Sequence, residues 1–414
     1  MIGIEPFAGA RAVLAERNFR LFAIGHAIAY VGFWVNFVAV GWLTWQLTGS
    51  PTWLGIVGFA DLFPALVIGP FAAALIDRWD RRRVLMVTVL SVVAQMSTLF
   101  VLVFAEFITI EGFLVLVLFQ GVIIAFSQPA TPALIAHLVR KENLPAAMAV
   151  DASIAQVTNF MGPVVAGFIL VLGDIAFAFL FNAICYFSYF VSIFLIRMEA
   201  TKHAWRVRDS VLSEVREGLR YAVAHRGIGP ILLLLLIEGM IARPVSQLLP
   251  GFAAEVFGRG AEGVATLNAA IGLGALVAAL WLAHRGRIAG LTALTLGSFV
   301  LLGGAMLAFG AATAFPAGVA AMVVFGAATS ALVVGSQTLT QCAVDDAVRG
   351  RIMGAVFLIS RGGAAFGTLI MGRLADTFGL QAPVLGGALI LGIFWLWTMN
   401  RRRAITAAFE TGSD

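Results

Sequence analysis

Charged residues are scarce in this chain of 414 residues, at 12% of the total, against about 25% in an ordinary soluble domain. Hydrophobic residues make up 61%, and the mean hydropathy is +0.97. This balance excludes a disordered, a fibrous and an ordinary soluble globular protein. It also excludes nucleic-acid binding as the cause of the basic pI of about 9.8. The net charge of +5 comes from 27 basic and 22 acidic residues, so their positions along the chain matter most.

Lysine and cysteine are nearly missing as well. The two lysines, Lys141 and Lys202, do not follow a glycine, so the chain has no nucleotide-binding P-loop. The two cysteines, Cys185 and Cys342, lie in apolar runs without a CxxC partner or a histidine at ligand spacing. We therefore expect no cofactor, no metal, no nucleotide and no nucleic acid. The residues before the first apolar run lack the short apolar core of a cleavable signal.

Long apolar runs are what the sequence has in abundance. Twelve runs are long enough to cross a membrane as helices, which takes about 20 residues each. They are 19–48, 52–76, 83–105, 111–136, 146–173, 175–197, 228–253, 262–283, 288–311, 315–341, 351–373 and 381–400. Helices satisfy their own backbone hydrogen bonds in lipid. The sequence therefore predicts an all-α integral membrane protein with twelve transmembrane helices.

The basic residues indicate the orientation of these spans. If both termini face the cytoplasm, 23 of the 27 Lys and Arg residues lie in inner segments. Arg259 and Arg373 fall at outer loops, and Arg243 and Arg361 fall within spans. The positive-inside rule thus predicts a multi-pass protein of the bacterial cytoplasmic (inner) membrane with both termini in the cytoplasm.

The spans form two halves joined by the longest polar stretch. We expect a six-helix bundle at 1–197, a cytoplasmic linker at 198–227, a second bundle at 228–400 and a cytoplasmic tail at 401–414. Apolar residues at helical spacing within the linker predict an amphipathic helix on the inner membrane face, or a solvated linker helix. The segments 127–132 and 336–341 match at an offset of 209 residues, which also carries Arg140 onto Arg349. Such a repeat is typical of a secondary transporter with a central site.

Five segments resemble the major facilitator superfamily, over roughly residues 17–400. They are Ala73–Arg83, Glu142–Ala147, Gly162–Gly167, Leu248–Gly258 and Val348–Met353. The first resembles the signature G-x-L-a-D-R-x-G-r-[KR], with Ala73 and Asp80 replacing glycines. Its DR-x-D-RRR pattern is similar to the enterobactin-exporter and drug-efflux (drug:proton antiporter) branch. The resemblance implies the major facilitator fold, with two pseudo-symmetric six-helix bundles.

Two further details come from the resemblance. Gly162, Pro163 and Gly167 are similar to the antiporter signature GPxxGG of the fifth span. Proton-coupled members often carry an arginine three residues before the Gln-Gly of the fourth span. Here Val117 takes that place before Gln120, so the resemblance assigns no proton coupling to that site.

The resemblance also implies a conformational gate at the inner membrane face. Its residues are Asp77, Arg78, Arg81 and Arg82 after the second span, with Gly350 and Arg351 at the start of the eleventh. Asp77 would meet the positive N-terminal end of the eleventh helix. That contact would hold in the outward-open state and break in the inward-open one. The alternative for the arginines is ordinary positive-inside surface charge.

Among the charged residues within spans, Asp61, Glu238, Arg243 and Arg361 are the candidates for a role in transport. A charge at the bilayer centre costs about 2.5–3.5 kcal/mol on insertion scales, so each is kept for pairing or for transport. A low-dielectric site favours a neutral carboxyl group, which makes Asp61 and Glu238 candidate proton carriers. The alternative is a structural pairing with Arg243 or Arg361. In a continuous helix Glu238 and Arg243 stand about 140° apart and would not share a face.

Amide side chains within the spans are candidates for lining a central cavity, although hydrogen bonding between helices is their commoner use. They are Asn36, Gln120, Gln128, Gln156, Asn159, Gln247, Gln337 and Gln341. His26, near the inner end of the first span, is interpreted as a packed neutral histidine.

These observations predict a secondary transporter that exports a small amphipathic compound by alternating access, coupled to proton influx. The compound would be a drug, a siderophore or a lipid-like metabolite, and the direction rests on the resemblance. The alternatives are an uncoupled facilitator or importer of the same fold, and an integral-membrane enzyme or scaffold. The expected partners are the small-molecule substrate, protons and membrane lipids. We expect a monomer, since each half can bury its polar face against the other.

Overall fold

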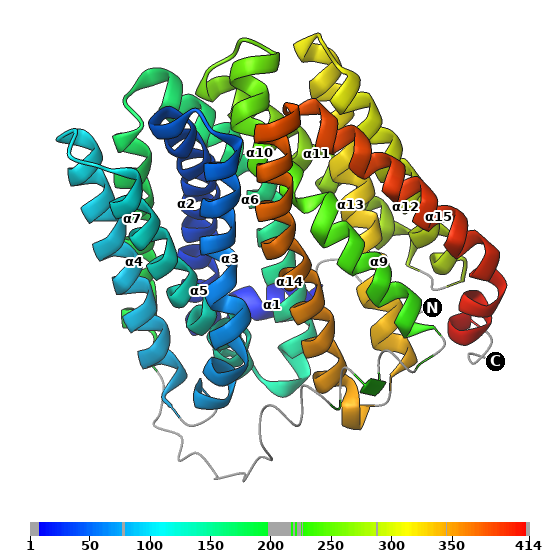
Figure 1. The fold of residues 1–414 in the computed structure, drawn as a ribbon. Coiled ribbons are helices and arrows are strands. Elements are labelled where there is room, and N and C mark those ends of the chain that lie inside the picture. Colours follow the sequence, from blue (N-terminus) through cyan, green and yellow to red (C-terminus); the bar gives the residue numbers. More distant parts are fainter. Residues whose placement is uncertain are drawn as a thin grey trace. The chain divides into compact units, whose positions relative to one another are not determined.

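The computed structural model describes residues 8–76, 79–197, 227–286, 289–344 and 346–410, with a few isolated positions between 217 and 225. Within this part of the chain, 12 helices are long and apolar enough to cross a membrane (Figure 1). Their bounds lie within a few residues of the predicted spans, so the prediction of an all-α protein with twelve transmembrane helices is confirmed. The predicted linker helix at 198–227 falls almost entirely outside the described residues.

The chain divides into two compact units, the first formed by Met1–Val40 and Pro64–Val207 and the second by Gly41–Phe63 and Arg208–Asp414. The division falls inside two helices, α2 (Arg17–Thr48) and α3 (Pro51–Ile76). The predicted bundles at 1–197 and 228–400 stay a prediction, and packing assigns the segment Gly41–Phe63 to the second unit.

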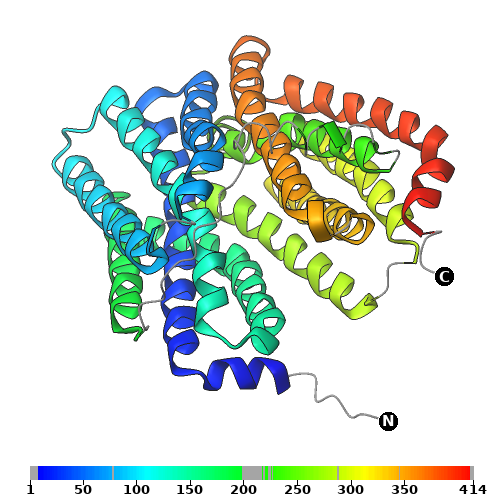
Figure 2. The same cartoon turned by 90° about the horizontal axis from the view of Figure 1, so that it is seen from below.

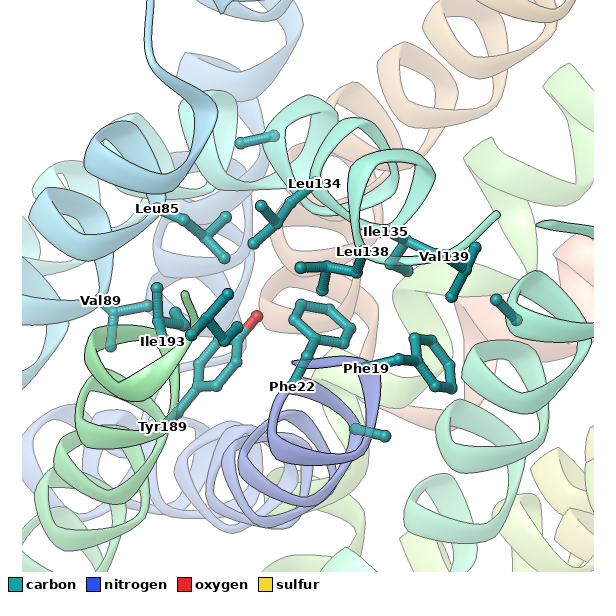
Figure 3. Packing of buried hydrophobic residues seen from close by; sticks show 14 of the residues in the cluster. Phe19, Phe22, Leu85, Val89, Leu134, Ile135, Leu138, Val139, Tyr189 and Ile193 are labelled. Atoms are coloured by element: carbon teal, nitrogen blue, oxygen red, sulfur yellow. The ribbon is translucent and has the colours of Figure 1, made fainter. Parts of the chain in front are cut away.

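The other helices of the first unit are α1 (Ala8–Ala15), α4 (Arg81–Phe104), α5 (Ile110–Leu138), the 3₁₀ turn η1 (Lys141–Asn143), α6 (Leu144–Leu172) and α7 (Ala176–Leu195). A bend at Glu16 separates α1 from α2, and the two helices run in clearly different directions (Figure 2). Residues of α2, α4, α5 and α7 form one apolar core, in which Phe22 lies beside Tyr189 (Figure 3).

Local sequence explains where these helices start and stop. Gly49 follows α2 with a φ of +58°, a left-handed conformation that suits glycine, and Pro51 then opens α3. Asp80 caps α4, because its side chain accepts hydrogen bonds from the backbone N–H groups of Arg82 and Arg83 at 3.0 and 3.2 Å. This capping accounts for the aspartate where the family signature has a glycine.

The helices of the second unit are α9 (Ile228–Ile241), α10 (Arg243–Gly251), the π-helical turn η2 (Phe252–Val256), α11 (Ala261–Arg285), α12 (Leu291–Ala311), α13 (Phe315–Ala343), α14 (Asp346–Phe378) and α15 (Gln381–Glu410). The predicted seventh span is confirmed as one candidate membrane span, Ile228–Val256. Within it a single turn residue, Ala242, separates α9 from α10, and its backbone keeps right-handed helical angles. Pro244 has no N–H to donate to the Met240 carbonyl, which removes one rung of the helix.

Glycines let the helix backbones of the second unit approach closely. A Cβ atom at Gly326 of α13 would collide with the Ile271 backbone of α11, and one at Gly274 would collide with the Val323 carbonyl. Gly363 and Gly367 of α14 face the carbonyls of Leu236 and Met240 on α9 in the same way. Small residues serve this purpose in membranes, where no hydrophobic drive holds helices together and close packing must do so.

The first prediction concerns this packing. Replacing Gly326 by valine should destabilise the protein by about 1–3 kcal/mol, the usual range for overpacking. A valine at Gly297 of α12, where nothing lies within 4 Å of a Cβ atom, should leave stability unchanged. Thermal unfolding of the two purified variants in detergent measures the difference. Equal midpoints would contradict the close α11–α13 contact.

Candidate functional site

Glu238 is a fully buried carboxylate within the seventh span, with 0% of its surface exposed. Its Oε1 atom lies 3.5 Å from Nε of Arg243, the first residue of α10. Neither carboxylate oxygen has a hydrogen-bond partner among the described residues. The expectation that these two residues would not share a face is wrong, since their side chains lie at ion-pair distance across the turn at Ala242. The pair therefore bridges the two pieces of the interrupted span.

Asp61 lies on the part of α3 that belongs to the second unit and interacts electrostatically with Arg361 of α14. Both side chains are half-buried. The Arg361 guanidinium also stands over the Phe357 ring, 5.1 Å from its centroid, a cation–π geometry. Each predicted carboxylate thus has an arginine neighbour.

Aromatic residues flank Asp61 and Arg361 along α3 and α14. Phe59 stacks on Phe63 with ring centroids 4.7 Å apart, and it lies 5.7 Å from Phe366 of α14. Phe357 and Phe366 are themselves exposed. These stretches of α3 and α14 therefore carry one carboxylate, one guanidinium and several aromatic rings, with Phe59 and Phe63 standing about 200° around α3 from Asp61.

Glycines hold this part of α3 against α14. A Cβ atom at Gly372 would lie 2.7 Å from the Pro51 carbonyl oxygen, and one at Gly55 would collide with the Thr368 carbonyl. Arg361, Thr368 and Gly372 are seven and four residues apart, so they share one face of α14. The same face that admits the α3 backbone therefore carries the arginine.

The amide side chains fall into three groups. Asn36 and Gln120 are buried, and each has an oxygen without a hydrogen-bond partner in the described part of the chain. Gln156, Asn159 and Gln247 are half-buried. The exposed group comprises Gln128 of α5, with Gln337 and Gln341 of α13.

Gln128 and Gln337 occupy equivalent positions in the sequence repeat, 209 residues apart, and both are exposed. An amide is poorly accommodated by lipid, because its hydrogen-bonding groups would stay unpaired there. We therefore interpret these two exposed positions as facing water.

The loop arginines bind other elements of the first unit. The Arg82 guanidinium donates hydrogen bonds to the Ile193 and Phe194 carbonyls at 3.1 and 2.7 Å, which caps the C-terminal end of α7. Arg81 contacts the ring nitrogens of His137 on α5, at 3.1 Å from Nδ1 and 2.6 Å from Nε2. These contacts give both arginines a structural role within the unit.

The rest of the predicted gate is only partly described. Asp77 and Arg78 lie outside the described residues. Gly350 is exposed, and Arg351 lies in α14, which begins at Asp346, one turn earlier than expected. The contact between this loop and the eleventh span therefore stays a prediction.

The antiporter-type segment lies within α6. Gly162 and Pro163 are buried and Gly167 is half-buried. A Cβ atom at Gly162 would collide with the Trp34 side chain of α2, so this glycine permits a close α2–α6 contact.

One polar pair was not predicted from the sequence. Nδ1 of His26 on α2 lies 2.8 Å from Oδ1 of Asp151 on α6. His26 is therefore an ion-pair or hydrogen-bond partner and more than a packed ring. The sequence does mark Asp151 as a candidate functional residue, because it is a charged residue about two turns inside an apolar span. Its neighbour could not be read from the sequence.

Comparison with known proteins adds three findings. A family described as transmembrane secretion effector matches residues 8–409. The chain is 25% identical to the staphyloferrin A transporter of Staphylococcus aureus over 384 residues, covering 91% of this chain and 94% of that protein. It is 27% identical to the enterobactin exporter EntS of Escherichia coli over 386 residues, covering 90% and 88% respectively.

Among solved structures, the fold is similar to an inward-facing, unoccupied bacterial homologue of the human lysosomal transporter Spinster. The TM-score is 0.73 at 12% identity, covering 95% of this chain and 98% of that one. A POT family transporter in complex with 5-aminolevulinic acid gives a TM-score of 0.74 at 11% identity, covering 94% and 97%. These likenesses confirm the predicted major facilitator fold.

The second prediction concerns the buried pair. Arg243→Gln leaves Glu238 buried and unpaired, which for a fully buried pair costs about 3–5 kcal/mol. Because the Arg243 side chain is 45% exposed, we expect less, about 1–3 kcal/mol. The double variant Glu238→Gln, Arg243→Gln should recover most of this loss. Thermal unfolding tests it, and an unchanged single variant would contradict the pairing.

The third prediction concerns the exposed amides. In a Cys342→Ser background, where the remaining Cys185 is buried, cysteines at Gln128 and Gln337 should react with a hydrophilic maleimide. Matched controls are Phe119→Cys on α5 and Val324→Cys on α13, both exposed and about 180° and 140° around their helices from the amides. Lipid should protect the controls. Equal labelling at all four positions would contradict a water-facing surface.

Proposed function

Because the chain belongs to the transmembrane secretion effector family of the major facilitator superfamily, we propose that it exports a small amphipathic compound by alternating access, coupled to proton influx. The family makes the chain a transporter rather than an enzyme, which removes the membrane-enzyme alternative. The observation that carries the proposal is the pairing of two carboxylates within the spans, Glu238 and Asp61, with Arg243 and Arg361.

Binding of a proton changes the net charge of each carboxylate–arginine pair. With the carboxylate ionised, a carboxylate–arginine pair is neutral, and with the carboxyl protonated it carries +1. A positively charged substrate group would raise the charge to +1 or +2 respectively, and charge is unfavourable in a low-dielectric site. The ionised pair therefore accepts such a group more readily than the protonated one. Proton and substrate exclude each other, which is the requirement for exchange.

The turn at Ala242 in the seventh span would couple this exchange to a movement of the helix. Glu238 stands at the end of α9 and Arg243 at the start of α10, so protonation weakens the link between two helical pieces. Discontinuous spans near the bilayer midplane are a common place for substrate and ion sites in secondary transporters. Movement at Ala242 would carry the change of charge into the backbone.

The substrate class follows from the surroundings of Asp61 and from the relatives. Arg361 stands over the Phe357 ring, and Phe59, Phe63 and Phe366 add aromatic surface to the same two helices. Two relatives are named for staphyloferrin A transport and enterobactin export. A siderophore, a drug or a lipid-like metabolite with an apolar body and a neutral or cationic polar group is the compound we propose.

We also propose where the protein lies and which residues form its inner gate. The protein would lie in the bacterial cytoplasmic membrane as a monomer, with both termini in the cytoplasm. The loop with Asp77 and Arg78 would close against Gly350 and Arg351 as the inner gate.

An uncoupled facilitator or importer of the same fold is the second candidate. The same pairing favours it, because an arginine can keep its carboxylate permanently ionised. Such a carboxylate is a structural partner and binds no proton.

The fourth prediction tests the coupling. Proteoliposomes holding the protein alone receive a pH gradient, a pH-sensitive dye, and a panel of lipophilic cations and siderophores. We expect substrate-dependent collapse of the gradient, abolished in Asp61→Asn and in Glu238→Gln. Glu111→Gln, which changes an exposed carboxylate at the start of α5, should behave like the unmodified protein.

Three outcomes separate the candidates. Proton movement that survives both substitutions would remove the two carboxylates as carriers. Substrate equilibration without proton movement would favour the facilitator. A proton that travels in the same direction as an acidic substrate would contradict the exchange mechanism.

A further inference from the structure

The first unit contains a second polar site that the proposed exchange does not use. His26 of α2 is 7% exposed, and the Asp151 side chain of α6 is 20% exposed. Their nearest ring nitrogen and carboxylate oxygen are 2.8 Å apart, a short hydrogen-bond distance. The carboxylate is the more accessible of the two groups, so it can pass a proton to the buried ring.

Aromatic rings fix the imidazole in place. Tyr30 meets the His26 ring edge-on at 4.5 Å between centroids, and Tyr189 of α7 stacks on it at 5.3 Å. Phe22 packs beside it at 5.0 Å, and Figure 3 shows Phe22 and Tyr189 side by side. The orientation of the ring is therefore determined by α2 and α7, while its partner comes from α6.

The surroundings are unusually rich in tyrosine. The chain has only four tyrosines, and three of them, Tyr30, Tyr186 and Tyr189, interact with one another here. Three packed helices present titratable or polar groups to the pair, in addition to Asp151 itself on α6. These groups are Tyr30 on α2, the hydroxyl of Thr131 on α5, and Cys185, Tyr186 and Tyr189 on α7. Arg82 is held by the Ile193 and Phe194 carbonyls, one turn further along α7.

The charge of this pair responds to a proton in a particular way. A neutral imidazole beside an ionised carboxylate carries a net charge of −1. One added proton gives a net charge of zero, whether it resides on Nδ1 of His26 or on Asp151. A low-dielectric site favours the state without net charge. The geometry therefore suits uptake of a single proton.

We propose that His26 and Asp151 form a proton-binding site in the first unit, and that its occupancy sets the contact between α2 and α6. The same two helices meet again where Gly162 admits Trp34. Asp151 and Gly162 are eleven residues apart, about three turns, so they share a face of α6. A change at the pair is thus transmitted along one helix face to the antiporter-type segment. The use of this site in transport rests on the proposed function, but binding of the proton does not.

Histidine NMR of the full-length protein in detergent micelles tests the binding directly. The chain has five histidines, so isotope-labelled imidazole carbons give few signals. We expect the His26 signal to change with pH in one step as the pair takes up its proton, and to vanish in His26→Gln. Asp151→Asn removes the nearby charge and should displace the midpoint by about one pH unit or more. Glu111→Gln, an exposed carboxylate of the same unit, should leave it in place.

The His26 NMR signal can also be assigned without the His26→Gln variant. If His26→Gln does not fold, single replacement of the other four histidines assigns the His26 signal by elimination. A His26 signal that does not titrate, or a midpoint unchanged in Asp151→Asn, overturns the proposal.

Transport measurements separate this site from the proposed function. In proteoliposomes, Asp151→Asn should flatten the dependence of transport on pH, whereas Glu111→Gln should not. Should the unmodified protein move no protons while His26 still titrates, the proposed function fails and the site stands. Should proton exchange occur while the His26 signal does not change with pH, the function stands and this inference fails.

Discussion

An ionisable group inside a lipid bilayer has to be paired, because water is not there to solvate it. Three carboxylates within the described spans obey this constraint: Glu238 lies beside Arg243, Asp61 beside Arg361, and Asp151 beside His26. Each pair joins two helices or two pieces of one helix. Pairing therefore does more than neutralise charge, since it also links neighbouring helices or two pieces of one helix.

Such pairs require helices that approach closely and reproducibly. In water the hydrophobic effect would supply the attraction, but lipid is as apolar as the helix surface, so packing has to replace it. Gly363 and Gly367 bring α14 against α9, and Gly372 brings α14 against α3. The same helix then presents Arg361 to Asp61. Backbone contact and charge pairing are thus two results of one arrangement of small residues.

The helices themselves were readable from the sequence because a membrane imposes one length and one composition on every span. The turn at Ala242 was not predicted, although Pro244 lies beside it, since hydropathy averages over a window and ignores a missing N–H donor. Glu238 and Arg243 lie at ion-pair distance across that turn, against expectation. Sequence gives the depth of a residue in its span but not its neighbour across the bundle. Asp151 shows this limit, because its role depends on His26, 125 residues away.

The three pairs differ in how a proton changes their charge, and this difference bears on what the transporter can carry. A carboxylate–arginine pair goes from neutral to +1 on protonation, whereas the His26–Asp151 pair goes from −1 to neutral. The first kind resists a proton unless an anion arrives with it, and it excludes a cation that arrives with a proton. The second kind takes up a proton alone, without any substrate. Under the proposed exchange, a chain that holds both kinds would keep a proton in one unit while the other binds substrate, and the charge of the substrate would decide whether the two move together or in exchange.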